Sequence, residues 1–295
     1  MINFNNLQKV ILSNGETLTY RKEGVGEKLL LLIHGNMSSS KHWDMLVEKL
    51  QDKYKIIAVD MRGFGGSTYN NPIDSLNDFA KDIEELLSQL NVEKCSVIGW
   101  STGGGVALEL AANIKKKIEK VILLESVGIK GYPIPKKDGN GIPTNELLKT
   151  KEEISKDPVQ VKPVLDALES KNKEFYRMLW NAAIYTHNKP EDSLYEEYLE
   201  DMLTQRNLVD VDYALATFNM SSESNGVIDG SNRCELVEAP VLILQGDRDY
   251  VVPMSMAEDT NRFLKNSKIV VLKNSGHSPM IDCMDNLLEE INKFL

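Results

Sequence analysis

Three side chains in this chain of 295 residues have the surroundings that nucleophilic chemistry requires. Ser101 lies in the pentapeptide formed by residues 99–103, which has the form Gly-x-Ser-x-Gly. A serine hydroxyl attacks a carbonyl group only when a base removes its proton, and a third group must hold that base in the correct tautomer. His277 and Asp249 are the candidates for the base and for the acid that orients it.

The sequence around Ser101 predicts a sharp turn between a strand and a helix. Residues 95–98 are largely apolar and include two β-branched or aliphatic residues, whereas residues 104–111 are rich in Ala and Leu. A serine on such a turn adopts strained backbone angles, which its neighbours tolerate only if they have almost no side chain. The two flanking glycines satisfy this need, and the turn directs the backbone amide of Thr102 toward the group under attack. The alternative is a flexible turn that leads into a helix.

His277 and Asp249 each follow a predicted strand near the C-terminus. Asp249 comes after the apolar run 241–244, and His277 comes after the run 269–272. Ligands of parallel sheets bind beyond the carboxyl ends of the strands, so both side chains are expected to meet Ser101 there. The order serine, acid, histidine is expected when a nucleophile turn precedes an inserted segment.

Two other carboxylates compete with Asp249 for the role of the acid. Asp247 lies two residues earlier in the same loop, and Glu125 ends the predicted strand after the Ser101 helix. We favour Asp249 because of its spacing to the Val252-Pro253 pair.

The rhythm of the chain predicts an α/β fold with a doubly wound, mostly parallel sheet. An Asn-Gly pair at 14–15 separates two β-prone runs and indicates an antiparallel hairpin at the start. Short aliphatic runs that read as buried strands then alternate with helical patterns. The predicted strands are 29–33, 56–59, 95–98 and 121–124, and the predicted helices are 41–50 and 75–90.

The alternation stops between about residues 127 and 239. Residues 131–141 are rich in Gly and Pro and predict an irregular stretch, and helix-like segments without a buried strand follow. One of these places Phe175, Met178, Leu179, Ala182 and Ala183 on one face. We therefore expect an α/β core at 1–127 and 239–295, with a helical cap inserted at 128–238.

Composition excludes several classes of function. With 34 basic and 44 acidic residues the net charge is -10, which disfavours nucleic acids and anionic membranes as partners. The three cysteines are scattered, the N-terminal residues 1–6 lack the features of a signal peptide, and no run reaches about 18 apolar residues. We expect a cytoplasmic protein without a membrane segment. The oligomeric state is not encoded in these features.

Motifs for other chemistries do not occur in the sequence. There is no HExxH pair for zinc, no glycine-rich loop that ends in Lys-Ser or Lys-Thr, and no GxGxxG after a strand. We expect no metal and no cofactor.

Five motifs in order resemble those of the α/β-hydrolases, in particular the lid-bearing serine esterases. They comprise an oxyanion loop at 34–36, a DxRGxGxS-like loop at 60–67, the turn at 99–103, an acid loop at 246–253 and a histidine loop at 276–277. The resemblance covers the predicted sheet domain and fails only across the cap. It implies hydrolysis of small carboxylic esters through an acyl-enzyme.

The resemblance also implies a role for each matched residue. Ser101 would be the nucleophile, His277 the general base and then acid, and Asp249 the orienting carboxylate. The backbone amides of Asn36 and Thr102 would form the oxyanion hole. Met37 and Trp100 flank the nucleophile and would line the acyl pocket, although a role in packing fits them equally well.

The resemblance leaves the substrate open. The Trp next to the serine and the HGNM sequence at 34–37 are similar to intracellular depolymerases of short-chain polyhydroxyalkanoates, and lactonases share the same motifs. A ligand receptor that has retained the hydrolase fold is the alternative from another class.

Four further polar residues have structural roles in our interpretation. We expect His34 to be packed and hydrogen-bonded beneath the oxyanion loop, and His187 to lie at the surface or to contact substrate. Asp60 and Arg62 are expected to form a charge-assisted pair that fixes their own loop.

Overall fold

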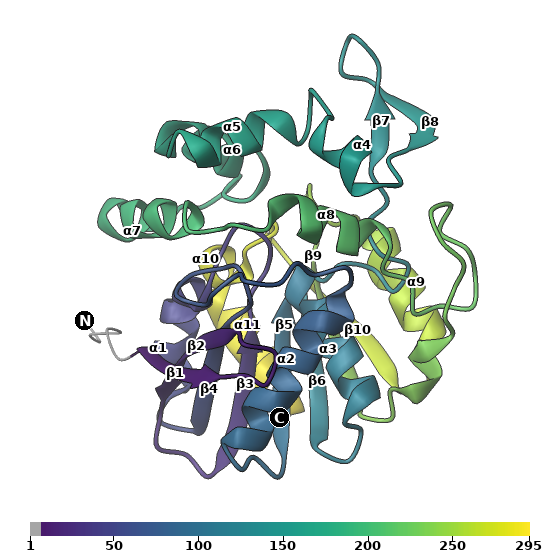
Figure 1. Ribbon diagram of the computed structural model, residues 1–295. Coiled ribbons are helices and arrows are strands. Elements are labelled where there is room, and N and C mark those ends of the chain that lie inside the picture. The colour runs from purple at the N-terminus through teal and green to yellow at the C-terminus, as the bar shows by residue number, and fades with distance from the viewer. Residues whose placement is uncertain (1–6) are drawn as a thin grey trace.

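A central sheet of eight strands organises the chain, and the computed structural model describes it over residues 7–295 (Figure 1). The spatial order is β1-β2-β4-β3-β5-β6-β9-β10. The strands are β1 Leu7–Ile11, β2 Thr17–Glu23, β3 Lys28–Ile33, β4 Tyr54–Asp60, β5 Cys95–Trp100, β6 Ile118–Leu124, β9 Val241–Gly246 and β10 Ser267–Leu272. The predicted fold class, a doubly wound and mostly parallel sheet, is confirmed.

The hairpin predicted at the N-terminal end forms one edge of this sheet. β1 pairs antiparallel with β2, and β2 pairs antiparallel with β4. Gly15 takes a φ of 83°, which a glycine in this tight turn adopts without strain. The other pairings in the eight-stranded sheet are parallel, so the carboxyl ends of β3, β5, β6, β9 and β10 meet at one edge.

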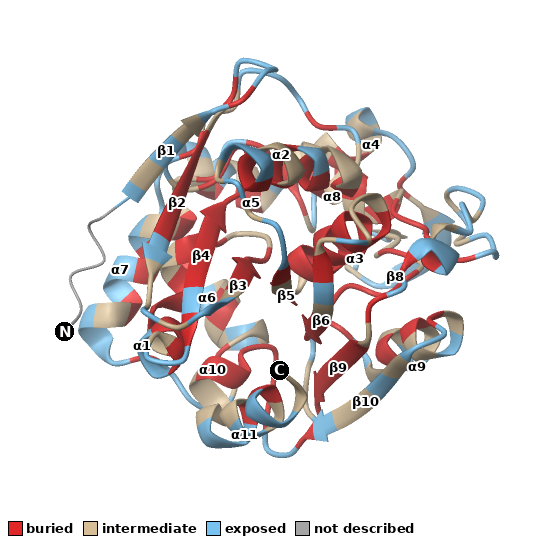
Figure 2. Ribbon diagram, turned by 90° about the horizontal axis from the view of Figure 1, so that it is seen from below, coloured by how far each residue is buried: buried red, intermediate tan, exposed pale blue. Residues whose placement is uncertain are grey.

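Helices cover both faces of the sheet because the central strands are apolar on both sides. In β3, Leu31 and Ile33 face one core cluster while Leu30 and Leu32 face the other. The first cluster includes residues of α2 Leu76–Gln89, α3 Thr102–Asn113 and α9 Met254–Phe263. The second includes residues of α1 Asp44–Leu50, α10 Pro279–Asp282 and α11 Met284–Phe294. Figure 2 shows the buried strands between these two helical layers.

We call the segment 128–238 the insertion. Its helical part, residues 151–216, lies over the carboxyl ends of the strands (Figure 1), whereas residues 233–237 return to the core beside α3. The insertion contains α4 Lys151–Ser155, α5 Lys162–Glu169, α6 Lys173–Ala183, α7 Asp192–Met202, α8 Leu208–Ala216 and the short 3-10 helix η2 Arg233–Leu236. It also contains a two-stranded hairpin, β7 Pro135–Lys137 with β8 Pro143–Leu147. The expectation of a wholly irregular stretch at 131–141 was wrong here. This hairpin is largely exposed, so no alternation of apolar residues marks it in the sequence.

The expected apolar face of α6 was wrong in part, because Phe175 and Leu179 pack against the core but Met178 does not. Tyr176 and Trp180 are the buried residues of this helix, whereas Met178 is 61% exposed. The Trp180 ring lies 5.2 Å from the ring of His42 and 6.3 Å from that of Trp100. Contact with these aromatic side chains of the core sets the orientation of α6. Helical spacing in the sequence does not predict that contact.

No helix within the described residues 7–295 is both long and apolar enough to cross a membrane. The prediction that residues 1–6 are not a signal peptide concerns a segment outside the described residues.

Truncating Phe79 should test how much the α2 contact with the sheet stabilises the fold. The side chain is fully buried and its ring lies 6.2 Å from that of Phe64. We expect Phe79→Ala to lower the free energy of unfolding by about 3–5 kcal/mol in urea titration, because a cavity replaces the ring. Lys81→Ala, on the solvent side of the same helix, should change it by less than about 0.5 kcal/mol. Equal effects would contradict this packing.

Candidate active site

Ser101 occupies the predicted sharp turn between β5 and α3. Its φ of 54° and ψ of -120° lie outside the regions that side-chain-bearing residues normally adopt. A Cβ atom on Gly99 would lie 2.2 Å from the Gly103 carbonyl oxygen, and one on Gly103 would lie 2.2 Å from that of Ile33. The two glycines are therefore required by space as well as by conformation. The flexible-turn alternative does not describe this strand, turn and helix.

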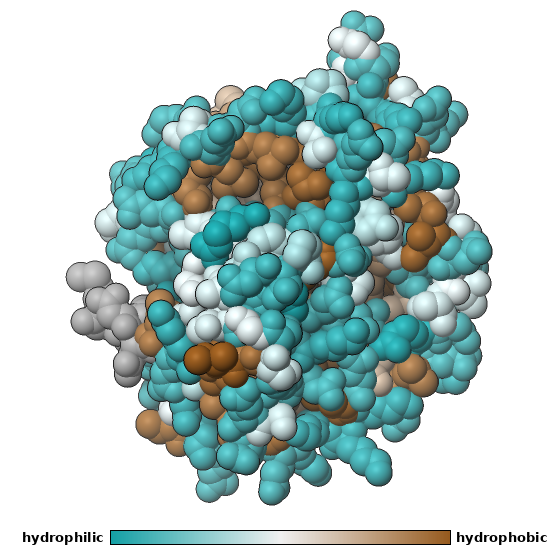
Figure 3. All heavy atoms as spheres, viewed as in Figure 1, coloured by the Kyte–Doolittle hydropathy of each residue, from teal (hydrophilic) through white to brown (hydrophobic). Residues whose placement is uncertain are grey.

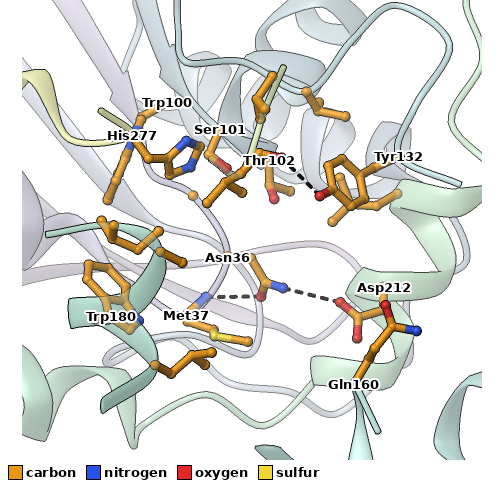
Figure 4. Close-up of a pocket in the computed structure, with 18 of the residues that line it drawn as sticks. Asn36, Met37, Trp100, Ser101, Thr102, Tyr132, Gln160, Trp180, Asp212 and His277 are labelled. Atoms are coloured by element: carbon orange, nitrogen blue, oxygen red, sulfur yellow. Dashed lines mark hydrogen bonds between the residues drawn. The ribbon is translucent and has the colours of Figure 1, made fainter. Parts of the chain in front are cut away.

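The Ser101 hydroxyl faces an open cavity beside His277 (Figure 4). Within residues 7–295 it makes no hydrogen bond to another residue. His277 Nδ1 lies 2.8 Å from Asp249 Oδ2, and both side chains are almost fully buried. The pKa of Asp249 is lowered from its usual value despite burial, because His277 and its other hydrogen-bond partners stabilise the carboxylate.

Trp100 holds the backbone of the histidine loop. Its indole Nε1 donates a hydrogen bond to the His277 carbonyl oxygen at 2.8 Å, and the two rings lie 5.8 Å apart. Since Trp100 directly precedes Ser101, one buried side chain ties the turn to the loop that carries the imidazole.

The two competing carboxylates do not contact His277. Asp247 accepts a hydrogen bond from the Ser275 amide at 3.1 Å, which stabilises the loop itself. Glu125 is fully buried, and its two oxygens accept from the Gly246 amide at 2.8 and 2.9 Å. Burial and the neighbouring Asp249 raise the pKa of Glu125 well above its usual value, which favours the protonated form that can donate a hydrogen bond to Asp249.

Two backbone amides lie next to Ser101 without a protein acceptor. Neither the Asn36 amide nor the Thr102 amide donates to an oxygen of residues 7–295. A Cβ on Gly35 would lie 3.0 Å from the Ser101 Cβ, which shows how closely the loop that carries Asn36 approaches the serine.

The side chain of Asn36 is fixed by three hydrogen bonds. Its Oδ1 accepts from the Met37 amide at 3.0 Å and from Gln205 Nε2 at 2.8 Å, and its Nδ2 donates to Asp212 Oδ1 at 3.3 Å. Met37 in this loop has a φ of 54°, so it is, like Ser101, a non-glycine residue in the left-handed region. Gln205 and Asp212 come from the insertion, which therefore helps to fix this loop.

A cavity of about 280 Å³ lies between the sheet and the insertion. Ser101, His277, Met37 and Trp100 all line it, together with Thr102 and Asn36. Most of its other walls are apolar and come from the insertion, among them Ile134, Val161 and Leu179. On the face drawn in Figure 3, hydrophobic residues also gather between helices α5 and α6 and helices α7 and α8. Such walls favour an apolar ligand.

His34 and His187 lie where the sequence analysis expects them. His34 is fully buried, and its Nε2 accepts a hydrogen bond from the Met61 amide at 3.0 Å. Its Nδ1 therefore carries the proton and donates to the Gly35 carbonyl at 2.7 Å. Burial lowers the pKa of His34 to about 4, so the ring is neutral. His187 is exposed and does not line the cavity.

The expected pair between Asp60 and Arg62 was wrong. Arg62 forms two short hydrogen bonds with Asp82 of α2, at 2.7 and 2.6 Å. Asp60 instead accepts from the amides of Ser40 and Gly66, both at 2.9 Å. Arg62 therefore attaches the loop to α2, whereas Asp60 attaches it to the 3-10 helix η1 Ser40–Trp43.

Asp212 is the site residue that the sequence analysis missed. It lies on α8, lines the cavity and accepts one hydrogen bond, from Asn36. Burial raises its pKa to about 7, and no cation among residues 7–295 pairs with it. No motif surrounds Asp212, so only its position opposite Asn36 reveals it.

Comparison with known proteins identifies the family of this chain. A family model described as alpha/beta hydrolase fold matches residues 28–282. This chain belongs to that family. It is 27% identical to the pimeloyl-[acyl-carrier protein] methyl ester esterase of Aliivibrio salmonicida over 286 residues, covering 95% of this chain and 96% of that protein.

Solved structures share this alpha/beta hydrolase fold. An esterase from Exiguobacterium antarcticum has a TM-score of 0.73 and 18% identity, over 97% of this chain and 98% of its own. A structure named as an N-acyl homoserine lactone degrading enzyme has a TM-score of 0.69 and 17% identity, over 98% and 100% of the two chains. At these identities the structures show a common fold.

The described residues contain no group of three or more His, Cys, Asp or Glu side chains arranged to hold a metal ion. The cysteines Cys95, Cys234 and Cys283 are unpaired thiols.

Gly99→Ala should disrupt the turn that carries Ser101. The new Cβ would overlap the Gly103 carbonyl, so we expect a loss of at least about 2 kcal/mol in the free energy of unfolding, measured by chemical denaturation. Gly139→Ala is the matched control, because a Cβ there meets no atom within 4 Å. A Gly99→Ala protein as stable as the control would refute the close approach.

The stability of an Asp212→Asn variant should depend on pH. The pKa of Asp212 is about 7 in the folded chain, so the unfolded chain releases this proton at a lower pH than the folded chain does. Ionisation therefore destabilises the wild type as pH rises from about 4 to 7. At pH 8 we expect Asp212→Asn to be more stable than wild type by up to about 4 kcal/mol, and at pH 4 to be nearly equal to it. A difference that is independent of pH would contradict the raised pKa.

Proposed function

We propose that this chain is a serine hydrolase that cleaves carboxylic esters through an acyl-enzyme. The observation that carries the proposal is the hydrogen bond between His277 Nδ1 and Asp249 Oδ2, 2.8 Å long, at the cavity wall where Ser101 lies. Membership of the alpha/beta hydrolase fold family supports it. So does the activity for which the Aliivibrio relative is named, because a methyl ester contains the acyl-oxygen bond that this reaction breaks.

In the first half of the proposed reaction, His277 takes the proton of Ser101 as the oxygen attacks the ester carbonyl. Asp249 keeps the His277 proton on Nδ1, which leaves Nε2 as the base, and stabilises the imidazolium that forms. The amides of Asn36 and Thr102 donate to the developing oxyanion. His277 then protonates the departing alcohol, and the acyl group remains on Ser101.

In the second half, water takes the place of the alcohol. His277 removes a proton from the water, the resulting hydroxide attacks the acyl-enzyme, and the acid leaves as Ser101 regains its proton. The chain's own residues supply every proton transfer in this scheme.

The insertion would act as a cap that shapes the acyl pocket. Its side chains supply most of the apolar cavity wall, and Met37 and Trp100 line the wall beside the serine. Binding of an apolar acyl or alcohol chain there would place the ester bond against Ser101.

Replacing the proposed nucleophile is the direct test. We expect Ser101→Ala to reduce kcat/KM for p-nitrophenyl butyrate by at least about 10³-fold without changing the circular dichroism spectrum, because the attacking hydroxyl is lost. Asp249→Asn should reduce it by about 10²-fold or more, and Asp247→Asn by less than about tenfold.

Three results would overturn these assignments. Retained activity in Ser101→Ala would exclude this nucleophile, and a larger loss in Asp247→Asn than in Asp249→Asn would exclude this acid. Stoichiometric labelling of wild-type Ser101 by a fluorophosphonate without turnover of any ester in a panel would favour a ligand receptor with a hydrolase fold.

A further inference from the structure

The polar groups of the cavity are divided between two positions. Ser101 and His277 lie on the sheet side, whereas Asp212 and Gln160 come from the insertion (Figure 4). Asn36 lies between the two groups and is hydrogen-bonded to Asp212. The cavity therefore has a second polar region that the proposed ester chemistry does not use.

This second region offers hydrogen-bond acceptors. Asp212 Oδ1 accepts one bond from Asn36 Nδ2, which at 3.3 Å is long, and the other carboxyl oxygen accepts none from residues 7–295. Gln160 uses its amide nitrogen to donate to the Pro135 carbonyl at 3.0 Å, and its oxygen accepts nothing from the described residues. A ligand group that meets the Gln160 oxygen or an ionised Asp212 has to be a hydrogen-bond donor.

The acid is not needed to hold Asn36 in place. An asparagine at position 212 would accept the same bond from Asn36 Nδ2 through its own Oδ1. Apolar walls around a carboxyl group raise the free-energy cost of ionising it, and the pKa of Asp212 is accordingly raised to about 7. No cation among the described residues offsets this cost of ionisation. The charge of Asp212 also helps to raise the pKa of the Tyr176 phenol on α6.

We propose that Asp212 is a specificity residue that accepts a hydrogen bond from a hydroxyl or ammonium group of the ester substrate, several bonds from the carbonyl attacked by Ser101. This inference rests on the proposed ester hydrolysis and narrows its substrate class. The preferred ester carries an apolar chain, which contacts walls such as Val161 and Leu179, and a donor at the end of that chain. Gln160 supplies a second acceptor for a donor with two or more protons.

The charge state of Asp212 suits both kinds of donor. An ammonium group would draw the proton off Asp212 and form a charge-assisted pair in a cavity that excludes most water. A hydroxyl group would bind either the ionised or the protonated acid, since it donates to one and accepts from the other.

The test compares esters that differ only at the end of one chain. Methyl esters of alkanoic acids are paired with their hydroxyl-ended and ammonium-ended analogues of equal chain length, and the same pairs are made on the alcohol side with acetate esters. Release of acid is followed by pH-stat titration over a range of chain lengths. We expect wild-type kcat/KM to favour one class of donor-ended ester by about ten- to hundredfold at one chain length.

Variants separate this role from a purely structural one. Asp212→Leu should bring the ratio of donor-ended to methyl-ended kcat/KM to about 1, and Asp212→Asn should remove a preference for ammonium. Asp210→Asn is the matched control, because Asp210 lies on the same helix, pairs with Lys151 at 2.6 Å and does not line the cavity. Its ratio should equal that of wild type.

Binding to Ser101→Ala protein gives a readout that does not depend on turnover. Calorimetry should show a dissociation constant about tenfold or more lower for the donor-ended ester than for its methyl-ended partner. Equal constants at every chain length would overturn the proposal, and so would an Asp212→Leu variant that loses activity equally on all esters, since Asp212 would then act only through Asn36. A failure of the proposed function is distinct, because it would abolish turnover of the methyl-ended esters as well.

Discussion

The backbone reversal at Ser101 is the constraint on which the rest of the site depends. The left-handed φ of 54° lifts the serine out of the sheet and starts α3 at once. The strain persists because the neighbours leave no alternative: Gly99, Gly103 and Gly35 each bring backbone or Ser101 within 3.0 Å or less of where a side chain would begin. Close packing at three points thus holds one hydroxyl at the open edge of the sheet.

The parallel sheet brings the remaining groups to that edge. β5, β9 and β10 end side by side with β6, so the loops that carry Ser101, Asp249 and His277 meet although they are far apart in the chain. Buried polar contacts then fix their orientation. Trp100 bonds to the His277 carbonyl, and Glu125 accepts from the Gly246 amide in the loop that leads to Asp249. Hydrogen bonds of this kind between buried polar groups are what a site with low solvent access requires.

The insertion adds a different kind of control. Its helices supply the apolar walls of the cavity, and Gln205 and Asp212 reach the side chain of Asn36 in the loop beside the serine. The core therefore supplies the proposed reacting groups, whereas the insertion shapes the space in front of them. Division of this kind lets one sheet support many substrates, since changes in the insertion leave the turn at Ser101 untouched.

The sequence by itself determined the fold class and the turn at Ser101, because both rest on local patterns, namely buried aliphatic runs and flanking glycines. It favoured Asp249 as the partner of His277 but left Asp247 and Glu125 open, and the contact in the folded chain decided among them. Only the tertiary structure decided that Arg62 bonds to Asp82 rather than Asp60, that Trp180 rather than Met178 is buried, and that Asp212 faces the cavity. These depend on contacts between segments distant in the chain. Helical spacing fixes which residues share a face but not which face meets the core, and a lone carboxylate on a helix carries no sign of its surroundings.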